Sequence, residues 1–370
     1  MFDLQLSASS LLRWRRAFLE SLLATSLCVF VVGIAFMPKE MKRIRAKPLE
    51  RVLFCAPTPD GKSIYSLVAS VNMEEVDRGQ TTRLVRWDLS TNATAALDVG
   101  SNLSPKCAIL DASGQRLFVG DARGCIIATG LQQPNKSDAF LGYVLKGFPE
   151  KMACTPDGRS LILQNHFGLF SWNIDARSHD FACPRWCHVD SSIGCFAVYP
   201  DSHLAVFSRT SDEGTPNQQS DLFEVDIHTG EFRLLHNKIG WRLIHLAISP
   251  NSEFLAGVED NGEVVLLDRC SSLEPWQACS IPGLCSGVTG IACFSLDSKL
   301  LITSDRETRR LIVWDLDQRK IKSTFEEHPT RVIGCDFLHD GQLLSWSFDT
   351  MLRVWNLDRT GLVRQINVSP

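Results

Sequence analysis

Short runs of alternating apolar and polar residues fill the chain from about residue 49 to its carboxy terminus. Turn-forming residues bound each run, which is the pattern of half-buried β-strands. One turn type returns at intervals of 43 to 53 residues. Its copies are Pro59-Asp60-Gly61, Ser113-Gly114, Pro156-Asp157-Gly158, Pro200-Asp201-Ser202, Pro250-Asn251-Ser252, Leu296-Asp297-Ser298 and Asp340-Gly341. The pattern therefore predicts seven structural repeats.

A repeat of about 40 to 50 residues with four short strands is typical of a β-propeller blade. In the last copy the strands are expected at Val332 to Phe337, Gln342 to Ser347, Leu352 to Trp355 and Leu362 to Val368. The sequence thus predicts an all-β, seven-bladed propeller of four-stranded antiparallel blades over residues 49–370. The carboxy-terminal strand is expected to complete the last blade.

The third strand of five repeats ends in the same kind of residue pair. These pairs are Trp87-Asp88, Trp172-Asn173, Leu267-Asp268, Trp314-Asp315 and Trp355-Asn356. The chain here resembles the WD-repeat family. The resemblance implies a structural hydrogen-bonded group in the seventh repeat, formed by His328, Ser345 (or Ser347), Asp349 and Trp355. The second repeat departs from the pattern, with Ala128-Thr129 where Trp-Asp is expected.

The resemblance also implies a function, namely a non-catalytic scaffold for protein–protein interaction. The alternative is a propeller enzyme of the lactonase-like or quinoprotein-like kind, with its site at the mouth of the central channel. The sequence has no phosphate-binding glycine loop, nucleophile elbow or His-Glu-x-x-His motif. Cys183, Cys187 and His188 lack a fourth zinc ligand nearby. We therefore expect no catalytic residue, no cofactor and no metal.

Candidate partner contacts come from two polar insertions and from aromatic and basic residues that precede inner strands. Both insertions lie between the second and third strands of a repeat, so they should emerge on one face, where repeat proteins often bind partners. Inert surface loops and gap-filling aromatic residues are the alternatives. The candidates are Glu74, Glu75, Asp77, Trp186, Asp212, Glu213, Trp241 and Arg242.

The amino-terminal region carries an uncharged stretch of 18 residues, Ser21 to Pro38, with basic residues on both sides. This is the short end of the length that spans a bilayer. We expect a tail at 1–16, one transmembrane helix or signal anchor at 17–38 and a basic juxtamembrane linker at 39–48. The chain would then be a single-pass membrane protein. A cleaved signal peptide with a weak site at Gly33-Ile34-Ala35 is the alternative.

Charge and cysteine content bear on partners and on the side of the membrane. Residues 1–47 carry a net charge of +5 and the rest of the chain −9, which disfavours nucleic acid as a partner. More Lys and Arg residues follow the uncharged stretch than precede it, which favours a cytoplasmic propeller. The short basic tail before the stretch favours the opposite orientation. Six of the thirteen cysteines recur in predicted innermost strands, which indicates packing rather than pairing. Free thiols favour a propeller on the cytoplasmic side.

Overall fold

The computed structural model describes residues 49–71, 81–91, 93–97, 104–131, 139–143, 147–165, 167–174, 193–201, 203–211, 219–239, 242–269, 276–279, 289–305, 308–326, 328–358 and 361–367. Contacts divide the chain into two units, Met1–Pro48 and Leu49–Pro370. The predicted tail, membrane helix and linker lie outside the described residues. Among the residues described, no helix is long and apolar enough to cross a membrane.

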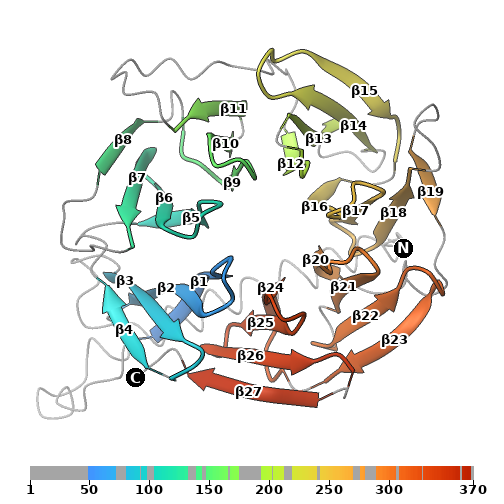
Figure 1. Cartoon of the computed structure of the whole chain (residues 1–370). Coiled ribbons are helices and arrows are strands. Elements are labelled where there is room, and N and C mark those ends of the chain that lie inside the picture. Colours follow the sequence, from blue (N-terminus) through green and yellow to red (C-terminus); the bar gives the residue numbers. More distant parts are fainter. Residues whose placement is uncertain are drawn as a thin grey trace, which may run out of the picture. The chain divides into compact units, whose positions relative to one another are not determined.

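The described part of Leu49–Pro370 forms seven antiparallel sheets arranged around a centre (Figure 1). We name them blades 1 to 7. Blade 1 contains β1 (Leu49–Pro57), β2 (Ser63–Val71), β3 (Thr81–Asp88) and β4 (Thr94–Leu97); blade 2 contains β5 (Pro105–Leu110), β6 (Arg116–Asp121), β7 (Cys125–Gly130) and β8 (Ala139–Tyr143); blade 3 contains β9 (Lys151–Cys154), β10 (Ser160–Asn165) and β11 (Gly168–Asn173).

The other four blades each have four strands. Blade 4 contains β12 (Ile193–Val198), β13 (Leu204–Ser211), β14 (Gln219–Asp226) and β15 (Phe232–His236); blade 5 contains β16 (Leu243–Ile248), β17 (Phe254–Glu259), β18 (Val264–Asp268) and β19 (Gln277–Cys279); blade 6 contains β20 (Thr289–Phe294), β21 (Leu300–Asp305), β22 (Leu311–Asp315) and β23 (Lys320–Phe325); blade 7 contains β24 (Val332–Phe337), β25 (Leu343–Ser347), β26 (Met351–Asn356) and β27 (Gly361–Asn367). The first strand of each blade is innermost (Figure 1).

Apolar packing between the faces of neighbouring blades holds the ring together. The described residues form seven buried apolar clusters, and each cluster draws on two neighbouring blades. Because a strand alternates sides at every residue, a strand that is apolar on both faces contributes to two clusters at once. We call each such interface a seam and number it by its blades. Burying these side chains is the main driving force for closing the ring.

Blade 7 completes itself with the end of the chain, as the sequence predicts. Its outer strand is β27, paired with β26. The ring closes at seam 1–7, where Val52 and Val68 of blade 1 pack with Leu344 of blade 7. There the Arg364 guanidinium also donates a hydrogen bond of 2.8 Å to the carbonyl oxygen of Leu89. The first and last blades in chain order therefore meet at this seam and close the ring.

The recurring turn has a recurring hydrogen-bond pattern. In blade 6 the Ser295 hydroxyl donates to the Asp297 carboxylate at 2.5 Å and accepts from the Leu300 amide at 2.9 Å. The equivalent turns of blades 1, 3 and 5 repeat both bonds. The next position takes a positive φ, 66° at Gly61 and 61° at Ser298. Glycine accepts that conformation freely, which explains why the turn often reads Pro-Asp-Gly.

One alignment made from the sequence is wrong. In blade 7, Trp355 of β26 pairs with Leu343 at the start of β25. In blade 2, Leu117 at the corresponding place in β6 pairs with Thr129 of β7, and Arg116 pairs with Gly130. The Trp-Asp position of blade 2 is therefore occupied by Thr129-Gly130, one residue later than predicted. Without a tryptophan to align, the sequence lacked the marker that fixes the register.

Candidate protein-binding groove

The four residues of the expected hydrogen-bonded group lie in blade 7, and three of them meet at one hydroxyl. The Ser345 oxygen accepts from the Trp355 indole at 2.7 Å and lies 2.8 Å from His328 Nε2. Asp349 instead accepts from Ser347 at 2.5 Å and from Arg353 Nη2 at 2.6 Å. Arg353 also lies 3.3 Å from His328 Nδ1 and so connects the two halves of the network.

The surroundings of His328 determine its protonation state and tautomer. Burial, reinforced by the positive charge of Arg353, lowers the pKa of His328 to about 4, so the ring is neutral at pH 7. Because a guanidinium can only donate, Nδ1 accepts and Nε2 donates to Ser345. The sequence did not point to Arg353, because its role depends on contacting both Asp349, in the turn between β25 and β26, and His328. The His328 ring and the Arg353 side chain are both buried, so this network has a structural role.

Most of the predicted partner contacts lie outside the described residues. These are Glu74, Glu75, Asp77, Trp186, Asp212, Glu213 and Trp241. Their insertions do connect β2 to β3 and β13 to β14, the second and third strands of their blades. Arg242 is described and is half-buried just before β16; its carbonyl oxygen accepts from the Asp260 amide at 2.8 Å. Cys183, Cys187 and His188 are likewise not described, and the described residues hold no cluster able to bind a metal.

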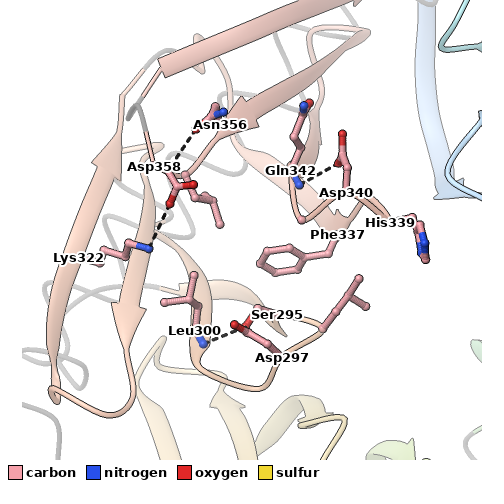
Figure 2. Close-up of a pocket in the computed structure, with 13 residues that line it drawn as sticks. Ser295, Asp297, Leu300, Lys322, Phe337, His339, Asp340, Gln342, Asn356 and Asp358 are labelled. Carbon is pink, nitrogen blue, oxygen red and sulfur yellow. Dashed lines mark hydrogen bonds and ion pairs between the residues drawn. The ribbon is translucent and has the colours of Figure 1, made fainter.

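A groove opens at seam 6–7, on the side of the ring where the first and second strands of each blade are joined. Its volume is about 420 Å³. We call it groove 6–7 (Figure 2). Its lining residues come from the turns of blades 6 and 7, from β23 and from the end of β26: Ser295, Leu296, Asp297, Leu300, Lys322, Phe337, His339, Asp340, Gly341, Gln342, Asn356, Leu357 and Asp358.

The floor of groove 6–7 is apolar. Phe337 and Leu300 belong to the buried cluster of seam 6–7 and also line the groove. In Figure 2 the Phe337 ring points into the space between the two turns, whereas His339 points away from it. Leu296, on the blade 6 turn, is 55% exposed. A large apolar side chain so exposed beside a buried phenylalanine marks a place where a partner can remove apolar surface from water.

The rim of groove 6–7 is acidic. It carries Asp297, Asp340 and Asp358, against a single lysine, Lys322, which lies 3.8 Å from Asp358 in an exposed ion pair. The hydroxyl of Ser295 lowers the pKa of Asp297, which is therefore ionised at neutral pH. Asp340 caps its turn by accepting from the Gln342 amide at 3.0 Å. Three aspartates against one lysine give the rim a formal net charge of −2.

The equivalent position at seam 1–2 holds a groove of different chemistry, groove 1–2. It has a similar volume, about 450 Å³, and is again formed by two neighbouring turns. Here Arg86 stands on the wall and donates to the Ser63 hydroxyl at 3.1 Å. At the position of the exposed Leu296 the blade 1 turn has Pro59. Only groove 6–7 of this pair therefore combines an exposed aliphatic side chain with an acidic rim.

Residues 319–356, which include β24 to β26 and the hydrogen-bonded network around Ser345, match the family model described as WD domain, G-beta repeat. This match and the seven-bladed ring support the WD-repeat propeller family. No curated protein matches the chain significantly. The fold and family prediction is confirmed to that extent.

Sequence reasoning missed groove 6–7, although a signal was present. Leu296 occupies the turn position where the blades 1, 3, 4 and 5 have Pro59, Pro156, Pro200 and Pro250. An aliphatic residue at the tip of an otherwise polar turn is informative. In the sequence pattern, Leu296 indicates only the position of the sixth repeat. Its neighbours Asp340 and Asp358 lie more than forty residues away in sequence, so only the folded ring brings them to one groove.

Proposed function

We propose that this chain is a protein-interaction scaffold and that groove 6–7 is one of its docking sites. The partner segment carries an apolar side chain flanked by Lys or Arg. The observation that carries the proposal is the exposed Leu296 beside Phe337, inside a rim with a net charge of −2. Many protein-interaction scaffolds are WD-repeat propellers, so the family match supports this general function.

Each feature of the groove contributes in a different way. Covering Leu296 and the outer edge of Phe337 supplies apolar burial, at about 25 cal/mol per Å². The carboxylates of Asp297 and Asp340 attract cationic side chains and reject acidic ones, which contributes to specificity and association rate more than to affinity. The resulting interaction is modest for one groove, as expected of a scaffold that holds several partners.

The test compares two sets of short fluorescent peptides, each with a central leucine, flanked either by Lys and Arg or by Glu. Fluorescence polarisation measures their binding to the full chain. We expect the basic set to bind and the acidic set not to bind. Combining Asp297→Asn with Asp340→Asn should weaken binding by about two- to ten-fold, the scale of exposed ion pairs. Asparagine preserves the turn, because Asn251 makes the same bonds in blade 5.

The matched control is Asp60→Asn, which makes the same change in the turn beside groove 1–2. Asp60 accepts from Thr58 and from the Lys62 amide, as Asp297 does from its own turn. The control should leave peptide binding unchanged. Equal binding of basic and acidic peptides, or equal losses in the control and the double variant, would contradict the proposal.

In this proposal the propeller has no catalytic role. Two titratable side chains of the innermost strands are relevant, Lys151 of β9 and His245 of β16. Lys151 donates to the carbonyl oxygen of Ile244 at 2.5 Å, and His245 Nε2 lies 2.9 Å from the carbonyl oxygen of Ala292. Burial lowers the pKa of His245 to about 4. The first contact joins blade 3 to blade 5 and the second joins blade 5 to blade 6, which supports a structural rather than a catalytic use.

The proposal also includes tethering to a membrane through residues 17–38, with the propeller in the cytoplasm. The uncharged stretch and its basic flanks support this part. Protease protection of a carboxy-terminally tagged chain in sealed vesicles of known orientation tests it. The tag should be protected in intact cells and digested after inversion. Release of the protein by alkaline carbonate would contradict tethering.

A further inference from the structure

Two cysteines from neighbouring blades meet at the inner end of seam 6–7. Cys293 lies in β20 and Cys335 in β24, the innermost strands of blades 6 and 7. Their sulfur atoms are 2.8 Å apart. A disulfide bond is about 2.05 Å long, so a further approach of about 0.8 Å would join them. Neither residue is fully buried.

Other described cysteines of the innermost strands have different surroundings. Cys107 donates to the carbonyl oxygen of Pro149 at 3.3 Å. Cys195 lies 3.2 Å from the Ser208 hydroxyl and is fully buried. These contacts fit the expectation that such cysteines pack as small side chains. At seam 6–7, where β20 and β24 are neighbouring innermost strands, two free thiols instead face each other.

The contact with Cys335 affects the protonation state of Cys293. The hydrogen bond to Cys335, together with burial, raises the pKa of Cys293 well above its usual value. Cys293 therefore keeps its proton at neutral pH, while either sulfur can be the donor in the contact itself. Because Cys293 holds its proton, Cys335 is the sulfur that attacks, and Cys293 is the thiol that resolves the intermediate.

We propose that Cys293 and Cys335 form a reversible disulfide when the protein meets a peroxide. The Cys335 sulfur loses its proton and attacks one peroxide oxygen; the O–O bond breaks and one water leaves, giving a sulfenic acid. The Cys293 sulfur then attacks the sulfenic sulfur. The S–O bond breaks, and the departing hydroxide takes the Cys293 proton and leaves as a second water. Two thiols and one peroxide thus give one disulfide and two waters, and a dithiol reductant reverses the change.

The disulfide would join blades 6 and 7 across the seam that carries groove 6–7. It spans 42 residues of sequence and restricts the unfolded chain, so the oxidised protein should be the more stable form. Its formation does not depend on any partner. The inference is therefore independent of the proposed docking function, and either can fail without the other.

The test uses the folded full chain treated with hydrogen peroxide, followed by alkylation of free thiols, trypsin digestion and mass spectrometry. Cys293 falls in the tryptic peptide 270–299 and Cys335 in 332–353. We expect these two peptides to be linked in the oxidised sample and separate after reduction. Because 270–299 also contains Cys270, Cys279 and Cys285, a second digestion with chymotrypsin assigns the linked cysteine.

Variants and a stability measurement complete the test. Cys293→Ser or Cys335→Ser should abolish the link, whereas Cys154→Ser, which alters a half-buried inner-strand cysteine of blade 3, should retain it. The melting temperature of the wild type should rise on oxidation and return on reduction, and Cys335→Ser should show no rise. Peptides that stay unlinked after peroxide treatment of the wild type, or a link that persists in Cys293→Ser, would overturn the proposal.

Discussion

Seams 6–7 and 1–2 occupy equivalent places in the ring but are built from different residues. At seam 6–7 the third strand of blade 7 presents Trp355, whose ring centroid lies 4.9 Å from that of Phe325. At seam 1–2 the same strand position of blade 2 is Thr129, buried beside Leu117. Both seams are nonetheless closed by buried apolar clusters. Apolar strands and their turns are therefore sufficient to form a blade and close its seam, whereas the tryptophan network adds stability to a blade that already forms.

The largest effect is expected from removing the outer strand of blade 7. Deleting residues 362–370 takes away β27 and leaves β26 as an unpaired edge. It also removes Arg364, which donates to Leu89 across seam 1–7. We expect the ring to open, with loss of cooperative thermal unfolding in calorimetry. The control, Arg364→Ala, removes one hydrogen bond and should unfold cooperatively. Unchanged thermal stability of the deletion would refute this account of closure.

Truncating Trp355 and the equivalent Thr129 measures how much stability each seam gains from its third-strand residue. Trp355→Ala removes a side chain that is 1% exposed and leaves a cavity, for a loss of about 3–5 kcal/mol in the free energy of unfolding. Thr129→Ala should cost about 1 kcal/mol. Urea denaturation of the full chain provides both values. Equal costs would mean that the two seams depend on their third-strand residues to the same degree.

Acid should weaken seam 6–7 through His328. Its folded pKa is about 4, below the value near 6.5 of an unfolded chain, so the unfolded state binds protons more readily. The stabilisation is complete above pH 6.5 and is lost as pH falls toward 4. Urea midpoints measured between pH 7 and pH 4 should fall less steeply in His328→Gln. His245 contributes a fall of the same sign and stays in both proteins. Parallel curves would contradict this role.

The smallest effect is expected at the grooves. Leu296→Ser makes the tip of the blade 6 turn polar and should change the free energy of unfolding by less than about 0.5 kcal/mol, because Leu296 is mostly exposed. Binding of basic peptides should nevertheless weaken. Pro59→Ser is the matched change beside groove 1–2 and should leave binding intact. A loss of binding in Pro59→Ser, or none in Leu296→Ser, would show that the two grooves do not differ as proposed.

Much of blade 7 could be predicted because its signals are local. The expected strand Val332 to Phe337 coincides with β24, and the expected outer strand overlaps β27. His328, Ser345 and Trp355 were named from motif positions, and the structure brings them together. Arg353 was not found, because no motif marks a residue that bridges two others. Partner contacts named from the insertions lie outside the described residues and stay predictions.

The number of repeats, the strand periodicity and the turns could be read from the amino-acid sequence, because they depend on residues within one blade. Which side chains of neighbouring blades lie together depends on the folded ring. Strand register places Thr129 at the tryptophan position of blade 2. The contact between blades 6 and 7 brings Cys293 next to Cys335, and the same seam places acidic residues around Leu296. Local alternation sets which side of a strand is buried. Closure of the ring sets which residues then become neighbours.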